Sequence, residues 1–122
     1  MIDYKKKIYI YDLNMPSLLA YYRDEIEEMG INIIHIDKLS WIDDDNYPLI
    51  INPLSCVSTK HWEEIKTYIP NNTNRNIILV APDYNKNELD DIVGIHSHLK
   101  TFCNSFDGQN FLNEINKNYE RL

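Results

Sequence analysis

The sequence is poor in glycine, in cysteine and in long apolar runs, and each shortage excludes a class of protein. Three glycines in 122 residues leave no glycine-rich loop of the kind that cradles a phosphate group. Two cysteines, Cys56 and Cys103, are too few for a disulfide framework, so a reduced cytoplasmic location is expected. Every apolar run falls far short of the roughly 20 residues that cross a bilayer, so no membrane association is expected.

Positive charge is also scarce. Twelve Lys and Arg residues face nineteen Asp and Glu residues, a net charge of −7, which repels the phosphates of nucleic acid. Nucleic acid is therefore not an expected partner. The hydrophobic fraction of 43% and the charged fraction of 25% are ordinary for a globular protein. The length suits one domain, and no internal repeat or linker composition divides it, so residues 1–122 are expected to form a single domain.

The hydrophobic pattern alternates between strand and helix. Short β-branched and aromatic segments predict five strands, at Lys7–Tyr11, Ile31–Ile36, Tyr47–Ile51, Asn76–Ala81 and Leu99–Cys103. Apolar residues at helical spacing predict four helices, at Pro16–Met29, Thr59–Ile69, Asn85–Val93 and from the N-cap Asp107 onward. Gly30 is expected to end the first of these helices and Pro70 the second. The stretch Asp37–Asn46 is too short and acidic for a full helix and is expected to hold one turn near Leu39–Ile42.

Strands that alternate with helices in this way predict an α/β fold with a parallel sheet and helices on both faces. Five strands in a chain of this length fit a flavodoxin-like three-layer α/β/α sandwich with strand order 2-1-3-4-5 and a shortened second helix. In that order strands 1 and 3 flank the point where the chain reverses direction across the sheet. Asp12, Leu13 and Asn14 follow the first strand and Asn52 follows the third, so these residues are expected near the ligand-binding edge.

Over nearly its whole length the chain resembles the receiver domain of two-component response regulators. Members of that family carry an acidic pair after strand 1, a phosphoacceptor aspartate after strand 3, a Thr or Ser after strand 4, and a Lys followed by Pro after strand 5. The corresponding residues here are Asp12 with Leu13, Asn52, Ala81, and Asn104 with Ser105. With the proline position set aside, four of the five signature positions depart from the family pattern, and the resemblance therefore implies a degenerate receiver, or pseudo-receiver.

These departures predict the function. An asparagine cannot accept a phosphoryl group as aspartate does, and Mg²⁺ depends on carboxylates that Leu13 and Asn52 do not supply. No hydroxyl at Ala81 and no ammonium at Asn104 would stabilise the transferred group. We therefore expect a non-enzymatic regulatory protein-interaction module that is not phosphorylated, with no cofactor and no metal.

The resemblance also implies where a partner would bind. In receivers the surface of helix 4, strand 5 and helix 5 commonly carries dimer and partner contacts. It maps here to Asn85–Val93, Leu99–Cys103 and Asp107–Leu122. A protein partner or a homodimer is expected on this surface, with interface candidates Phe102, Phe111 and Tyr119.

The alternative is a small flavodoxin-like ligand-binding protein or enzyme that uses the pocket where strands 1 and 3 end. Its candidate residues are Asp12, Asn14, Asn52, Ser55 and Ser58, although Ser58 serves equally well as a helix N-cap. A reactive thiol at Cys56 and a zinc site at His96 and His98 are less favoured, because neither has the partners that such chemistry needs. The run 43–45 of three aspartates is interpreted as a solvated turn rather than a calcium loop.

Overall fold

The computed structural model describes residues 6–12, 17–43, 45–53, 59–104 and 107–119. These residues build a five-stranded parallel sheet with the order β2-β1-β3-β4-β5, which confirms the predicted flavodoxin-like topology. The elements are β1 (Lys7–Asp12), α1 (Ser17–Glu28), β2 (Asn32–His35), the 3₁₀ turn η1 (Leu39–Trp41), β3 (Leu49–Asn52), α2 (Thr59–Asn71), β4 (Ile77–Val80), α3 (Lys86–Val93), β5 (Leu99–Phe102) and α4 (Gly108–Lys117).

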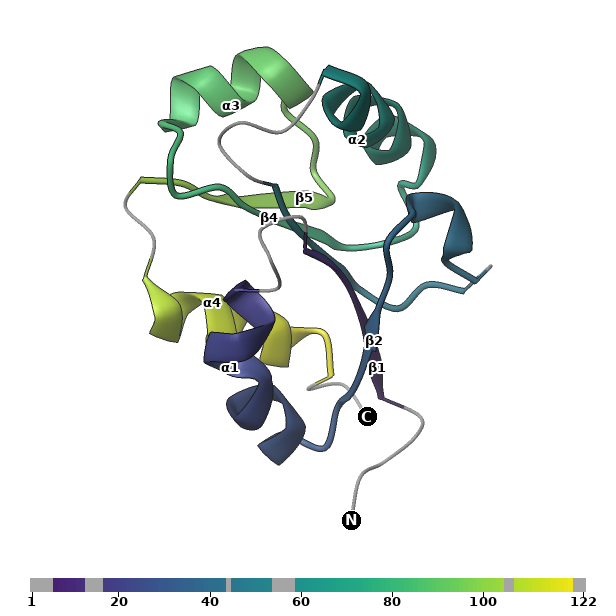
Figure 1. The fold of residues 1–122 in the computed structure, drawn as a ribbon, viewed down its shortest axis with the longest axis vertical. Coiled ribbons are helices and arrows are strands. Elements are labelled where there is room, and N and C mark those ends of the chain that lie inside the picture. The colour runs from purple at the N-terminus through teal and green to yellow at the C-terminus, as the bar shows by residue number, and fades with distance from the viewer. Residues whose placement is uncertain (1–5, 13–16, 44, 54–58, 105–106, 120–122) are drawn as a thin grey trace.

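Helices cover both faces of the sheet. Figure 1 shows α1 and α4 on one side of the strands and α2 and α3 on the other. Alternation along β1 divides the core accordingly: Ile8 and Ile10 pack with the α1 and α4 side, while Tyr9 and Tyr11 pack with the α2 and α3 side. All four residues of β3 are buried, as expected of a central strand covered on both faces.

The helix boundaries follow local signals in the sequence. Gly30 has φ of 80°, a left-handed conformation that suits glycine just past the end of α1. Asn85 and Glu88 form a reciprocal capping box at the start of α3. The Asp107 side chain accepts hydrogen bonds from the backbone at the start of α4, as predicted.

One helix end was predicted wrongly, because α2 runs through Pro70 to Asn71. A proline inside a helix removes one backbone hydrogen bond, but here the helix needs only one further residue. The side-chain amide of Asn71 donates to Thr67 O at 2.8 Å, and that of Asn72 donates to Tyr68 O at 2.8 Å. These side-chain bonds add donors to two carbonyls near the end of the helix.

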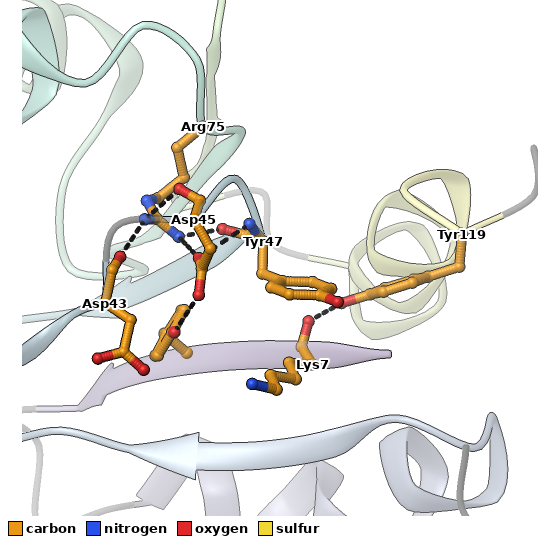
Figure 2. A network of polar contacts seen from close by, with 7 residues as sticks. Lys7, Asp43, Asp45, Tyr47, Arg75 and Tyr119 are labelled. Carbon is orange, nitrogen blue, oxygen red and sulfur yellow. Dashed lines mark hydrogen bonds and ion pairs between the residues drawn. The ribbon is translucent and has the colours of Figure 1, made fainter. Parts of the chain in front are cut away.

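The second crossover, between β2 and β3, holds only η1 and is fixed by a buried arginine. Arg75, which is 3% exposed, donates to Asp45 Oδ1 at 3.0 Å and to the carbonyls of Asp43, Asp45 and Tyr47 (Figure 2). Its guanidinium carbon lies 5.3 Å from the Tyr9 ring centroid, and the Tyr9 hydroxyl donates to Asp45 Oδ2 at 2.5 Å. An arginine that precedes β4 therefore holds in place a segment about thirty residues earlier.

Candidate functional site

The ends of β1 and β3 bring Asp12 and Asn52 together. The two residues are directly paired in the parallel register, and Asn52 Nδ2 donates a hydrogen bond to Asp12 Oδ1 at 3.0 Å. Asp12 is 6% exposed and Asn52 is 3% exposed. The prediction that these strand ends are neighbours is confirmed, and they carry a buried amide–carboxylate pair.

The chemistry of this pair differs from that of two carboxylates. Two buried carboxylates at hydrogen-bonding distance repel each other unless a proton or a cation lies between them. An amide instead supplies a donor to its neighbour, so the Asn52 side chain partly compensates the buried charge of Asp12 without a metal. The arrangement supports hydrogen bonding, and it offers no nucleophilic carboxylate at position 52.

Ala81 and Asn104, which the receiver resemblance assigns to the same site, follow β4 and β5. Ala81 follows β4 directly, is 1% exposed, and its N–H donates to Phe102 O at 2.7 Å. Asn104 follows β5 with an exposed side chain, and its N–H donates to Tyr84 O at 2.9 Å. The side chain of Ala81 is a methyl group and that of Asn104 is an uncharged amide. Neither is a charged group that could hold a phosphoryl group.

Several predicted site residues lie outside the described part of the chain. These are Leu13, Asn14, Ser55, Cys56 and Ser58. The alternative pocket is therefore represented here only by Asp12 and Asn52. The second cysteine, Cys103, is a buried free thiol that packs with the core on the α2 and α3 side.

The three interface candidates belong to the core. Phe111 is 0% exposed, Tyr119 is 8% exposed and Phe102 is 9% exposed. The Phe102 and Phe111 rings pack edge to face with centroids 5.9 Å apart, and the Tyr119 hydroxyl donates to Lys7 O (Figure 2). All three side chains pack in the same core cluster on the α1 and α4 side of the sheet, so they are not available to a partner. A surface on these elements must be formed by other residues.

His96 and His98 bind backbone carbonyls at two helix ends. His96 Nε2 lies 3.0 Å from Val93 O, at the last residue of α3, and His98 Nε2 lies 2.6 Å from Ile69 O, in the last turn of α2. Their ring centroids are 5.6 Å apart. Over the ranges that the structure describes, no group of three His, Cys, Asp or Glu side chains converges as a metal site would require.

The network around Arg75 was not predicted from the sequence. Burial alone would raise the pKa of Asp45, but hydrogen bonds from Tyr9, the Tyr47 N–H and Arg75, together with the Arg75 charge, lower it. Burial also raises the pKa of Tyr9, and Asp45 adds to that effect. Asp45 is therefore not part of a freely solvated turn. The only signals were an isolated arginine before an apolar strand and an acidic run, and no spacing rule connects the two.

A wider comparison gives no relative for this chain. A scan against protein-family models, a search of curated proteins and a search of solved structures each gave no match. Among the described helices, none is long and apolar enough to cross a membrane.

Proposed function

We propose that this chain is a regulatory protein-interaction domain that resembles a response-regulator receiver and works without phosphorylation. The observation that supports this most strongly is the buried hydrogen bond from Asn52 to Asp12, at the position where a receiver keeps its phosphoacceptor. An amide there accepts no phosphoryl group. It also gives Asp12 a partner that does not depend on Mg²⁺.

Ala81 and Asn104 support the same proposal from the neighbouring strands. In a phosphorylated site, a hydroxyl and an ammonium group would be expected to stabilise the transferred oxygens and to report the modification to the rest of the domain. A buried methyl group and an exposed amide do neither. The proposed domain is therefore non-enzymatic, and this site stays unphosphorylated.

Phosphotransfer tests the proposal. The protein is incubated with acetyl phosphate and Mg²⁺ and its intact mass is measured, with a receiver domain that keeps its aspartate as the positive control in the same mixture. We expect no mass increase for this chain and one phosphoryl group on the control. An acyl-phosphate adduct on this chain would overturn the proposal.

We further propose that the partner, which can be a second copy, binds to the surface of α3, β5 and α4. Ile95, in the loop from α3 to β5, is 81% exposed, and an exposed large apolar side chain of this kind suits a protein contact. The variant Ile95→Ser should weaken self-association, or capture of the partner, without loss of stability. Tyr21→Ser on α1, where the side chain is 78% exposed, is the matched control.

Sedimentation velocity over a range of concentrations measures self-association. A concentration-dependent dimer in the wild type and in Tyr21→Ser, but not in Ile95→Ser, supports the homodimer on this surface. A dimer that is equally stable in all three proteins would place the contact elsewhere.

A further inference from the structure

A groove of about 890 Å³ runs between the second crossover and α2. One wall is the segment from Asp37 to Ser40, which includes the start of η1, and the opposite wall is a face of α2. Tyr11 of β1 also lines the groove. Its volume is in the range of small-molecule sites, which is roughly 300–1,000 Å³. The groove is distinct from the Asp12–Asn52 pair, and the inference drawn from it does not depend on the proposed function.

The groove exists because the second crossover has no full helix. In a doubly wound sheet, a helix in this crossover would pack beside α2. Here η1 spans only three residues. The face of α2 that lines the groove carries Lys60, Glu64, Thr67 and Asn71, spaced at successive helical turns. This face is polar, so it is suited to a charged or hydrogen-bonding occupant rather than to a purely apolar one.

Tyr11 contributes a hydroxyl group to the lining of this groove. The residue is 1% exposed, yet its hydroxyl forms no hydrogen bond with any residue in the described ranges. Burial, together with the charges of Glu64 and Asp37, raises the pKa of Tyr11 to about 12, so its hydroxyl stays protonated at neutral pH. A hydroxyl that lines a groove without a protein partner is available to solvent or to a ligand.

The carboxylates near Tyr11 determine the charge that the groove prefers. Glu64 Oε1 accepts a hydrogen bond from Leu39 N at 3.0 Å, which fixes this carboxylate beside η1. Asp37 and Glu63 are the other two carboxylates of the lining, and Glu63 Oε1 pairs with Lys66 Nζ at 3.4 Å. These carboxylates do not belong to any three-ligand metal cluster among the described residues, which favours an organic cation over a metal ion.

The two lysines of the lining do not neutralise these carboxylates. Lys38 Nζ lies 5.7 Å from the ring centroid of Trp41, over an exposed aromatic face. Lys60, one helical turn before Glu64, has an exposed side chain and forms no ion pair with a residue in the described ranges.

We propose that this groove binds an organic cation, an alkylammonium or guanidinium group, between Glu64, Asp37 and the Tyr11 hydroxyl. The cation donates hydrogen bonds to the carboxylates and to the phenol oxygen, and its carbon chain lies along the groove beside Leu39. The cation can be a free polyamine or the side chain of a lysine or arginine, because both present the same donors to the site.

Titration by nuclear magnetic resonance of the ¹⁵N-labelled protein tests this. The probes are spermidine, a short neutral-ended peptide with one central arginine, and inorganic phosphate as an anionic control. We expect saturable amide shifts at Leu39, Ser40 and Thr67 with spermidine, with the peptide, or with both. Binding of spermidine alone identifies a free amine as the ligand, and binding of the peptide alone identifies a protein side chain.

Two variants locate the site, and a third is the control. Glu64→Gln removes the charge but keeps an acceptor for Leu39 N, and it should weaken binding about tenfold, as the loss of a charge-assisted hydrogen bond does. Tyr11→Phe removes only the hydroxyl and should weaken binding by a smaller factor. Glu114→Gln makes the same charge change on α4, across the sheet, and should bind as the wild type does.

The proposal is overturned if neither cation gives saturable shifts, if Glu64→Gln binds as tightly as the wild type, or if phosphate alone occupies the groove. Spectra of each variant without ligand show directly whether the fold is retained. Tyr11→Phe, the most conservative change, keeps the proposal testable if Glu64→Gln does not fold.

Discussion

At the scale of single residues, the chemistry of the strand ends depends on one nitrogen atom. Asn52 Nδ2 points a donor at Asp12 Oδ1 in a place where each residue is less than 10% exposed. If that nitrogen is replaced by oxygen, a favourable contact becomes a repulsion between two buried charges.

The variant Asn52→Asp should therefore lose stability and gain no activity. We expect a loss of about 1–3 kcal/mol in the free energy of unfolding at neutral pH, which shrinks in mild acid when a proton can bridge the carboxyls. Chemical denaturation at two pH values measures this. Asn104→Asp, an equal charge change at an exposed position, is the control and should change stability by less than about 0.5 kcal/mol.

Asn52→Asp is also expected not to take up phosphate from acetyl phosphate and Mg²⁺. Leu13, Ala81 and Asn104 still fail to supply the second acid, the hydroxyl and the ammonium group that transfer requires. Intact mass is the readout, and a phosphoryl adduct on this variant would show that the rest of the site is more complete than its residues indicate.

Arg75 is the residue whose removal should cost the most. Arg75→Met leaves the Asp45 carboxylate and several carbonyls of the second crossover without their donor, and should destabilise the protein by about 3–5 kcal/mol. Lys66→Met is the matched control, because it also removes the cation of an ion pair. Lys66 and Glu63 are both solvent-exposed, so this change should cost less than about 1 kcal/mol. Equal losses in the two variants would contradict the structural role given to Arg75.

At the scale of elements, the end of α2 is capped by the side chain of a histidine that directly precedes β5. His98 Nε2 lies 2.6 Å from the carbonyl oxygen of Ile69, in the last turn of the helix, and the other donor to this oxygen is Asn72 N at 3.4 Å. His98→Ala should lower the free energy of unfolding by about 0.5–1.5 kcal/mol, because it leaves that carbonyl with only the long bond from Asn72.

His35→Ala is the comparison for this measurement. His35 is exposed, with Nδ1 4.0 Å from Asp37 Oδ1, so this change should have little effect on the free energy of unfolding. Thermal and chemical unfolding of both variants provides the test. If the two changes were equal, His98 would not stabilise the end of α2.

The sequence predicted the elements whose causes are local. Strand β3 is an apolar run, α1 ends at Gly30, and α3 and α4 begin at capping side chains, so neighbours in sequence determine each of them. The end of α2 was missed because Asn71 and Asn72 compensate for Pro70, and this depends on where two side chains fold back.

In the candidate site, too, the sequence predicted some features and missed those that depend on contacts between distant segments. The pairing of Asp12 with Asn52 follows from the strand order, which the pattern predicted, together with the register that the structure shows. The binding of Asp45 to Arg75, the burial of Tyr119 and the groove beside Tyr11 arise from contacts between distant segments. Periodicity and local propensity carry no information on such contacts.

At the scale of the whole molecule, buried tyrosines make the stability of the fold depend on pH in the alkaline range. The pKa of Tyr9, Tyr11 and Tyr119 is raised above the ordinary value of 10.0, in each case chiefly by burial. Above about pH 10 the unfolded chain loses these protons while the folded protein still holds them, so unfolding becomes easier as the pH rises. Stability should be constant from neutral pH to about pH 9 and then fall.

Each of these tyrosines contributes a slope of up to about 1.4 kcal/mol per pH unit in the alkaline range. Tyr119→Phe should make the decline shallower, whereas Tyr21→Phe should not, because the Tyr21 side chain is 78% exposed in the folded protein. Urea unfolding between pH 7 and pH 11 measures the slopes. A stability that rises above pH 10 would contradict the assignment.

In the function proposed above, the Asn52 amide takes the place of a metal ion as a partner of Asp12 at the ends of β1 and β3. The most direct measurement follows the side-chain amide resonance of Asn52, assigned by its loss in Asn52→Ala, while Mg²⁺ and then acetyl phosphate are added at millimolar concentrations. We predict that this resonance stays in place, because Nδ2 remains bonded to Asp12 Oδ1. A saturable shift of the Asn52 amide with Mg²⁺, or a further shift with acetyl phosphate, would contradict the claim.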